Sequence, residues 1–271
     1  MITAMPRIAI AVHDFDVAVD TFRETLGMPV VDFSPQTAPT LGARVGMCVP
    51  PGGSNIELMA PFEPTKPLSQ ALQAFLDRRG EGPYALMLEA PDPDVEAVEL
   101  EARGLDVLGL MPGAGGRDVH PRSTHGVLIR VYPNDSARTG DVAGSGDLAL
   151  SGIVKVIIAT ADASIAASTY GDGLGLDVGP AVDDTERGVR SVVCRPPKGG
   201  VIELVSPADT SKPFARAIEQ SLKERHGGMY ALVLTAADTE RACARLADAG
   251  FVAPDAPPNE ATIFGARFVI A

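Results

Sequence analysis

Two apolar segments of the chain each carry a single carboxylate at the same place. Glu57 lies in CVPPGGSNIELMAP (48–61), and Glu203 lies in CRPPKGGVIELVSP (194–207). A carboxylate that an apolar strand partly removes from water could have a raised pKa and act as a base on a carbon acid. Arginine side chains nearby would lower that pKa instead. The sequence does not determine whether the pKa of these carboxylates is raised or lowered. That depends on the elements that position the two side chains.

The two segments belong to a longer repeat. TKP at 65–67 returns as SKP at 211–213, and GPYALMLEA returns as GMYALVLTA, both 146 residues later. Because a period this long indicates duplicated domains and not a solenoid, we expect a first domain over 1–134 and a second over 151–271. The polar, glycine-rich residues 135–150 between them are expected to form a flexible linker.

Each half repeats the order strand, helix, strands. An apolar strand over 7–12 precedes an amphipathic helix that ends near Gly27, and a strand over 83–90 precedes a helix that ends at Gly104. A further helix near 68–79 joins these two units. In the second half, a strand and a helix are expected over 233–250. We therefore predict an α+β fold with four βαβββ-like units, two in each domain.

The composition narrows the class of protein. A chain of 271 residues with 45% hydrophobic content can bury a globular core. Its formal charge of −12 argues against electrostatic binding to the phosphate backbone of nucleic acids, so no nucleic-acid partner is expected. No basic leader precedes the first apolar run, which argues against a signal peptide or a membrane span and for a cytoplasmic address. Three cysteines without CxxC spacing argue against a disulfide scaffold or a zinc knuckle.

Three segments in this order resemble the vicinal oxygen chelate superfamily, which includes glyoxalase I, the bleomycin resistance proteins, methylmalonyl-CoA epimerase and the extradiol dioxygenases. They are RIAIAVHDFDVAVDTFRETLGMPV (7–30), IELMAP (56–61) and HPRSTHGVLI (120–129). The last is similar to the closing segment of the epimerases. The resemblance implies paired units around a cavity, where a divalent metal sits on one His, Glu or Gln side chain from each of four strands.

The metal-ligand positions that the resemblance implies hold other residues here. In the first half they are Arg7, Glu57, Tyr84 and Arg130. In the second half they are Lys155, Glu203, Tyr230 and Val269, and Arg267 lies two residues before Val269. Arginine and lysine offer only donors and repel a cation. We therefore predict neither a metal site nor another cofactor. Strand alternation should place each set, with Arg267 in the second, on one face of its sheet.

The substituted positions suggest roles for these side chains. In the first half Glu57 could be a base, and Arg7, Arg130 and Tyr84 could stabilise a developing oxyanion. Two arginines against one glutamate would leave a positive charge for an anionic ligand. The alternative to a functional site is a structural ion pair between cation and carboxylate, which we favour for Lys155 and Glu203.

The remaining candidate residues are assigned to substrate binding. By the resemblance, His120, Arg122 and His125 lie in the loop where the epimerases hold part of their thioester substrate. The second half contributes the residues at its own metal-ligand positions to substrate binding, namely Lys155, Glu203 and Tyr230, together with Arg267.

Two functions remain open at this point. One is a metal-independent isomerase, epimerase or lyase that acts on an anionic carbonyl compound such as an acyl-CoA or a keto acid. The alternative is a non-catalytic protein of the bleomycin-resistance type that sequesters a small molecule. Either way the expected partner is a small-molecule ligand. The chain could be a monomer, as an internal pseudo-dimer, or a homodimer.

Overall fold

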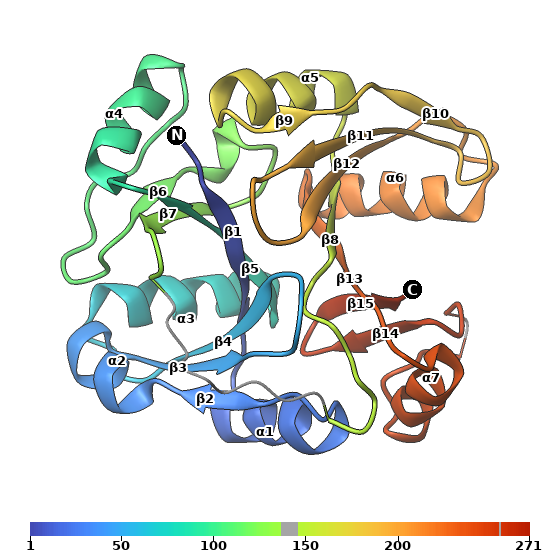
Figure 1. Ribbon diagram of the computed structural model, residues 1–271, viewed down its shortest axis with the longest axis horizontal. Coiled ribbons are helices and arrows are strands. Elements are labelled where there is room, and N and C mark those ends of the chain that lie inside the picture. Colours follow the sequence, from blue (N-terminus) through green and yellow to red (C-terminus); the bar gives the residue numbers. More distant parts are fainter. Residues whose placement is uncertain (137–145, 255) are drawn as a thin grey trace.

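Each half of the chain folds into its own mixed β-sheet (Figure 1). The computed structural model describes residues 1–136, 146–254 and 256–271. The first sheet contains β1 (Ala4–Ala11), β2 (Val30–Asp32), β3 (Ala43–Cys48), β4 (Asn55–Pro61), β5 (Gly82–Ala90), β6 (Arg117–Val119) and β7 (Ile129–Pro133). The second contains β8 (Lys155–Ala159), β9 (Asp177–Val178), β10 (Val182–Asp184), β11 (Val189–Arg195), β12 (Val201–Pro207), β13 (Gly228–Leu234), β14 (Glu260–Ile263) and β15 (Ala266–Ile270).

The two sheets have the same topology. Their strand orders are β2-β3-β4-β1-β5-β7-β6 and β10-β11-β12-β8-β13-β15-β14, with β9 paired to β11. The first strand of each half is central: β1 runs parallel to β4 and antiparallel to β5, and β8 runs parallel to β12 and antiparallel to β13. The predicted α+β fold with duplicated domains is confirmed. As described, the second unit of each half has two strands after its helix instead of three.

Seven α-helices lie among the described residues. They are α1 (Phe15–Asp20), α2 (Ser34–Leu41), α3 (Pro67–Arg79), α4 (Pro93–Ala102), α5 (Ala163–Ser168), α6 (Pro213–Arg225) and α7 (Thr239–Asp248). The helix after the first strand of every unit begins at an aspartate whose carboxylate accepts backbone N–H groups of the first turn, which stabilises a helix start. These four caps are Asp14, Asp92, Asp162 and Asp238. The repeated cap shows that the four units share one local design.

The helices divide between the two faces of each sheet. One large apolar cluster joins residues of α1, α4, α5 and α7 with one face of both sheets, and so spans the two halves. On the other face of the first sheet, leucines of α3 pack against β1, β3, β4 and β5. Helix α6 covers the corresponding face of the second sheet. The faces under α3 and α6 are the ones that carry the candidate site residues.

Glycines allow the two halves to approach closely at two related places. A Cβ at Gly126 would lie 2.7 Å from the backbone of Gly227, and a Cβ at Gly265 would lie 1.9 Å from the carbonyl oxygen of Glu81. Gly126 and Gly265 have positive φ angles of 87° and 65°, which favour glycine. The closing loop of each half thus touches the start of the other half's second unit.

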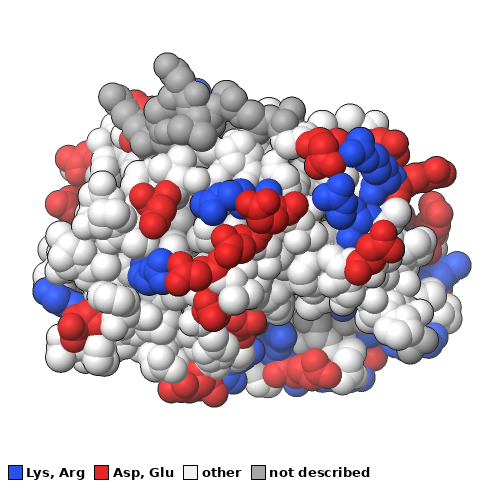
Figure 2. Space-filling model, turned by 90° about the horizontal axis from the view of Figure 1, so that it is seen from below, with Lys and Arg blue, Asp and Glu red and all other residues white. Residues whose placement is uncertain are grey.

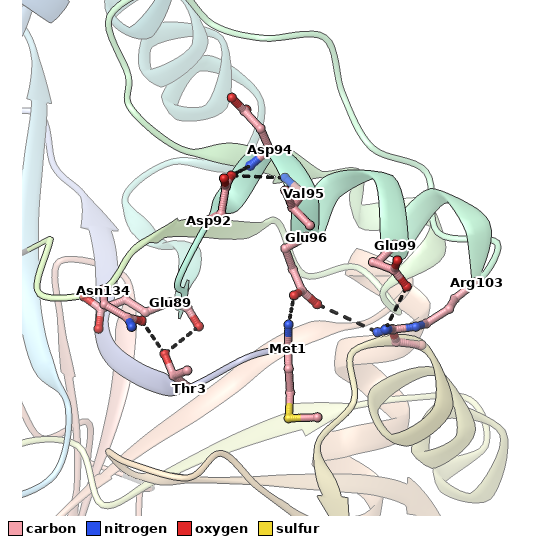
Figure 3. A network of polar contacts seen from close by, with 11 residues as sticks. Met1, Thr3, Glu89, Asp92, Asp94, Val95, Glu96, Glu99, Arg103 and Asn134 are labelled. Atoms are coloured by element: carbon pink, nitrogen blue, oxygen red, sulfur yellow. Dashed lines mark hydrogen bonds and ion pairs between the residues drawn. The ribbon is translucent and has the colours of Figure 1, made fainter.

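The first strand is tied to its own half at its beginning (Figure 3). The amino group of Met1 pairs with the buried carboxylate of Glu96 on α4, and Arg103 lies 3.8 Å from the same carboxylate. The hydroxyl of Thr3 donates to the carbonyl oxygen of Glu89, at 3.1 Å. These contacts fix the residues that lead into β1, and the register of β1 against β5 then shifts between Ala4 and Arg7.

The segment between the halves is only partly described. Of the expected linker 135–150, residues 137–145 lie outside the described ranges. Asp147 pairs with Arg241 and Arg245 of α7, at 2.8 and 2.9 Å. Leu148 and Leu150 are buried in the cluster that spans the halves. Residues 147–150 therefore pack as part of the fold. None of the described helices is long and apolar enough to cross a membrane.

Candidate functional site

Four of the predicted site residues lie on one face of the first sheet. Arg7 on β1, Glu57 on β4, Tyr84 on β5 and Arg130 on β7 share the face under α3, as strand alternation predicts. All four are buried, with exposed fractions between 1% for Arg130 and 8% for Tyr84. Charged groups survive at such depth only with partners, so the contacts of each one decide what the face can do.

Arg7 and Glu57 face each other without a good hydrogen bond. Arg7 Nε lies 3.4 Å from Glu57 Oε2. The Nη1 of Arg7 donates to the hydroxyl of Ser136, at 2.9 Å, and that hydroxyl donates to Glu89. The guanidinium also lies 4.6 Å from the ring centroid of Tyr132. The two residues therefore form an ion pair, and the additional contacts that position it are made by Arg7.

Arg130 has a counter-ion that the sequence reasoning missed. Its Nε and Nη2 donate to both carboxylate oxygens of Asp118, at 2.6 and 3.0 Å. Asp118 lies directly opposite Arg130 in the antiparallel pair of β6 and β7. The expected surplus of positive charge on this face is therefore wrong, because Asp118 neutralises the second arginine. A hairpin predicted for residues 117–131 would have placed Asp118 opposite Arg130.

Among the residues that the structure describes, three polar atoms on this face are buried without a hydrogen-bond partner. They are Arg7 Nε, Glu57 Oε2 and Arg130 Nη1. An unsatisfied buried donor or acceptor costs about 1–3 kcal/mol, more if it is charged. Two of these atoms, Arg7 Nε and Glu57 Oε2, are those of the ion pair at 3.4 Å, and Arg130 Nη1 is a further buried donor. Tyr84 lies on the same face, and burial raises the pKa of its hydroxyl even though the Arg130 charge opposes the rise.

In the second half the equivalent carboxylate has more partners, although its Oε2, like that of Glu57, is buried without a hydrogen bond to another described residue. Glu203 Oε1 accepts from Arg187 at 2.5 Å and from the Ser191 hydroxyl at 2.8 Å, and Lys155 Nζ lies 3.1 Å from Oε2. Burial disfavours the charged form of Glu203, but the Arg187 hydrogen bond and the two cations outweigh it and lower its pKa. Glu203 thus has the pairing that we favoured from sequence. Arg187 was not anticipated.

The other candidates of the second half pair with each other. The guanidinium of Arg267 donates to the hydroxyl of Tyr230 and lies 4.4 Å from the centroid of its ring. Arg267 also pairs with Glu260 at 3.2 Å. Tyr230 and Arg267 line a hollow of about 300 Å³ beside α6, so they are accessible, while Val269 contributes only an apolar side chain to the face.

The three residues of the closing loop separate in the structure. Arg122 has a side chain that is 73% exposed and pairs with Asp106, at 2.5 Å. His125 shares a hydrogen bond of 3.0 Å with Thr169 of the second half, and burial lowers its pKa. His120 Nδ1 accepts from the backbone N–H of Arg122, and its side chain borders a larger hollow.

That larger hollow lies where the two halves meet and has a volume of about 720 Å³. From the first half it is bordered by α3, the start of β5 and the loop before β7, and from the second by the end of α6 and the start of β13. Tyr84 belongs both to this hollow and to the face that carries Glu57. Of the four predicted residues on that face, Tyr84 lines the hollow, whereas Arg7, Glu57 and Arg130 do not.

The side chains at the family's metal positions do not suit a metal ion. Arg7 and Arg130 offer only N–H donors, and Glu57 is the one carboxylate among the four predicted positions. Among the residues described, no three His, Cys, Asp or Glu side chains are grouped so that they could hold a metal. The donor set on this face therefore does not fit the divalent ion that the resemblance implies.

The sequence matches one family model twice. The model of the Glyoxalase/Bleomycin resistance protein/Dioxygenase superfamily covers residues 7–120 and again residues 155–268. The chain belongs to this superfamily, the one that also bears the name vicinal oxygen chelate. No curated protein matches the chain in sequence.

One of the similar solved structures shares the fold over most of this chain, and two others match about half of it. A mutant of 4-hydroxymandelate synthase from Streptomyces coelicolor has a TM-score of 0.65 at 16% identity, over 94% of this chain and 77% of that chain. A mutant of methylmalonyl-CoA epimerase from the same organism, in complex with 2-nitronate-propionyl-CoA, is 24% identical with a TM-score of 0.43, over 50% of this chain and 97% of that one. The epimerase from Mycobacterium tuberculosis is 28% identical, with a TM-score of 0.40 over 49% and 89%.

Proposed function

We propose that the first half is a metal-independent active site for isomerisation, epimerisation or lyase chemistry on a small anionic carbonyl compound, such as an acyl-CoA or a keto acid. The observation that carries the proposal is the set of three buried atoms without a hydrogen bond among the described residues, Arg7 Nε, Glu57 Oε2 and Arg130 Nη1, of which the first two face each other at 3.4 Å. A bound carbonyl compound would satisfy all three, because it supplies acceptor oxygens for the arginines and an acidic C–H group for the carboxylate.

The chemistry follows from what each atom can do. Glu57 Oε2 takes the proton next to the carbonyl group, and the electron pair of that C–H bond moves to the carbonyl oxygen as an enolate. Arg7 Nε and Arg130 Nη1 donate to the developing oxyanion or to the carboxylate of the substrate. The Tyr84 hydroxyl can donate as well, because its raised pKa keeps it protonated. Return of the proton to the same face of the carbon regenerates the substrate with solvent hydrogen exchanged, and its return to the opposite face completes an epimerisation.

Proton exchange tests this proposal directly. Acyl-CoA thioesters and small keto acids are incubated with the protein in deuterium oxide, and deuterium at the carbon next to the carbonyl is followed by mass spectrometry. We expect Glu57→Gln to reduce exchange at least about 100-fold, the usual worth of a positioned base. Glu203→Gln is the matched control and should leave exchange unchanged. Dialysis against a chelator should also leave it unchanged.

The same experiment can overturn the proposal. Exchange that survives in Glu57→Gln, or that disappears with the chelator, would contradict it. Tyr84→Phe gives a second reading that does not depend on how well Glu57→Gln folds, because the ring and its contact with Phe75, at 5.2 Å between centroids, are kept. We expect this variant to exchange more slowly while its melting temperature stays near that of the parent.

A non-catalytic binding protein is the second candidate. The observation that favours it is that leucines of α3 cover the face with Glu57, whereas the large hollow stays open at Tyr84. A ligand held only in the hollow would be sequestered without reaction. In that case no compound would exchange protons, and Glu57→Gln would leave ligand affinity intact in a calorimetric titration.

A further inference from the structure

The hollow between the halves gathers arginines that lack carboxylate partners. Arg78 and Arg79 end α3, and Arg225 ends α6, and all three border the hollow. Among the described residues, none of the three has an ion pair. Arg78 Nε donates to the carbonyl oxygen of Ala74, at 2.9 Å. On the face in Figure 2, by contrast, basic side chains lie beside acidic ones.

The charge of the hollow has the opposite sign to that of the chain. The chain carries a formal charge of −12, yet three arginines and the side chains of His120 and His226 border the hollow against one carboxylate, Glu224. That carboxylate accepts from Gln220 on its own helix, at 2.7 Å. Unpaired guanidinium groups around a concave surface raise the local concentration of anions.

The rest of the lining is apolar. Phe75, Tyr84, Leu128 and Met229 contribute to the same surface. A volume of about 720 Å³ lies in the range of sites for organic ligands and cofactors. A ligand that fits both parts has an anionic end for the arginines and an organic body for the apolar wall.

We propose that this hollow, defined by Arg78, Arg79 and Arg225, binds the phosphate or diphosphate group of an organic ligand. The planar guanidinium donates two parallel hydrogen bonds to phosphate oxygens, and several arginines together suit a group with more than one negative charge. The site needs both halves, because α3 and α6 each supply arginine. It does not depend on catalysis at Glu57.

The duplication supports a built site. Arg79 and Arg225 are equivalent residues, 146 apart, and each ends the helix that covers its own sheet. The smaller hollow of about 300 Å³ is the equivalent surface of the second half and shares Glu224 and Arg225 with the large one. Arg78 is replaced by Glu224 at the equivalent position. The positive charge is therefore concentrated on the first half's side.

Calorimetric titration with inorganic pyrophosphate, and then with adenosine diphosphate, tests the proposal. The full chain should bind both, with affinity that falls as salt is added. We expect Arg79→Gln with Arg225→Gln to weaken binding at least about tenfold, equivalent to about 1.4 kcal/mol. Glu224→Gln should tighten binding. The matched control is Arg195→Gln, an exposed arginine outside the hollow that also has no ion pair among the described residues.

The outcomes separate this inference from the proposed function. Absence of binding at millimolar pyrophosphate, or equal affinity in the double variant and the control, would overturn the phosphate site. Neither result bears on proton exchange by Glu57. All four substitutions are at exposed positions, and thermal melting should show that the variants remain folded.

Discussion

The two halves place the same carboxylate on the same strand, yet give it different neighbours. Glu203 in the second half has Arg187, Ser191 and Lys155 around it. Glu57 in the first half has Arg7 at 3.4 Å and no hydrogen bond to another described residue, so the halves differ at Oε1, whereas Oε2 lacks a hydrogen bond in both. The second copy of the carboxylate is thus more fully paired than the first, although one oxygen of each lacks a hydrogen bond among the described residues.

The difference can be traced to two substitutions. Arg187 precedes Gly188 just as Leu41 precedes Gly42, and both glycines have positive φ angles, 72° and 75°. At the same offset, Ser191 of the second half corresponds to Val45 of the first. Leu41 and Val45 belong to the apolar cluster under α3. The first half therefore lacks both groups that bind Glu203 Oε1 in the second.

The largest effect should come from the buried pair of the first half. Asp118→Ala removes the counter-ion of Arg130, whose exposed fraction is 1%. Breaking a buried pair leaves an uncompensated charge and costs about 4 kcal/mol. Urea denaturation measures the loss of unfolding free energy. Asp183→Ala is the control, because it breaks an exposed pair with Arg190. A loss as small as that of the control would contradict the assignment of Asp118.

The equivalent change in the second half should have a smaller effect. Arg187→Leu leaves Glu203 with Lys155 and the Ser191 hydroxyl, so we expect a loss of about 2 kcal/mol, the worth of a hydrogen bond to a charged group. The same urea titration measures it, with Arg195→Leu as the exposed control. A cost equal to or larger than that of Asp118→Ala would reverse the comparison between the halves.

The stability of the second half should decrease as the pH falls below the ordinary pKa of a glutamate. The pKa of folded Glu203 lies below its ordinary value of 4.5. A carboxylate with a lowered folded pKa stabilises the protein above its ordinary pKa, and this contribution is lost as the pH falls through the folded pKa. Glu203→Gln should therefore lower stability at neutral pH and flatten the loss below about pH 5. Thermal melts across that range measure it. Parallel curves for parent and variant would show that Glu203 is not the group responsible.

The smallest effect on stability, and the sharpest on function, should follow when the first half is made like the second. Leu41→Arg together with Val45→Ser supplies Glu57 with the partners of Glu203, and a change within about 1 kcal/mol is expected because lost apolar burial offsets the new hydrogen bonds. Proton exchange should fall at least about tenfold. Leu41→Met is the volume-conserving control. Unchanged exchange in the double variant would show that hydrogen bonds to the Glu57 carboxylate do not control the reaction.

Much of the fold was predictable because the signals repeat. Equivalent aspartates begin the unit helices, and the IEL strand returns with its turn, so the duplication and the α+β class followed from sequence. Period-two alternation correctly placed Arg7, Glu57 and Arg130 on one face. Asp118 and Arg187 were missed because a short hairpin strand and a loop end supply them, outside the strands that the resemblance aligned. The alignment of Gly42 with Gly188 would have exposed the contrast between Leu41 and Arg187.

A high-resolution crystal structure of the protein soaked with a small keto acid would test the central claim most directly. The claim is that the face of the first half binds a ligand, while that of the second half is closed by its own pairs. We predict density for the ligand within hydrogen-bond distance of Arg7 Nε, Glu57 Oε2 and Arg130 Nη1, and none at Glu203. Water alone at these three atoms under saturating ligand, or ligand bound beside Glu203, would contradict the account.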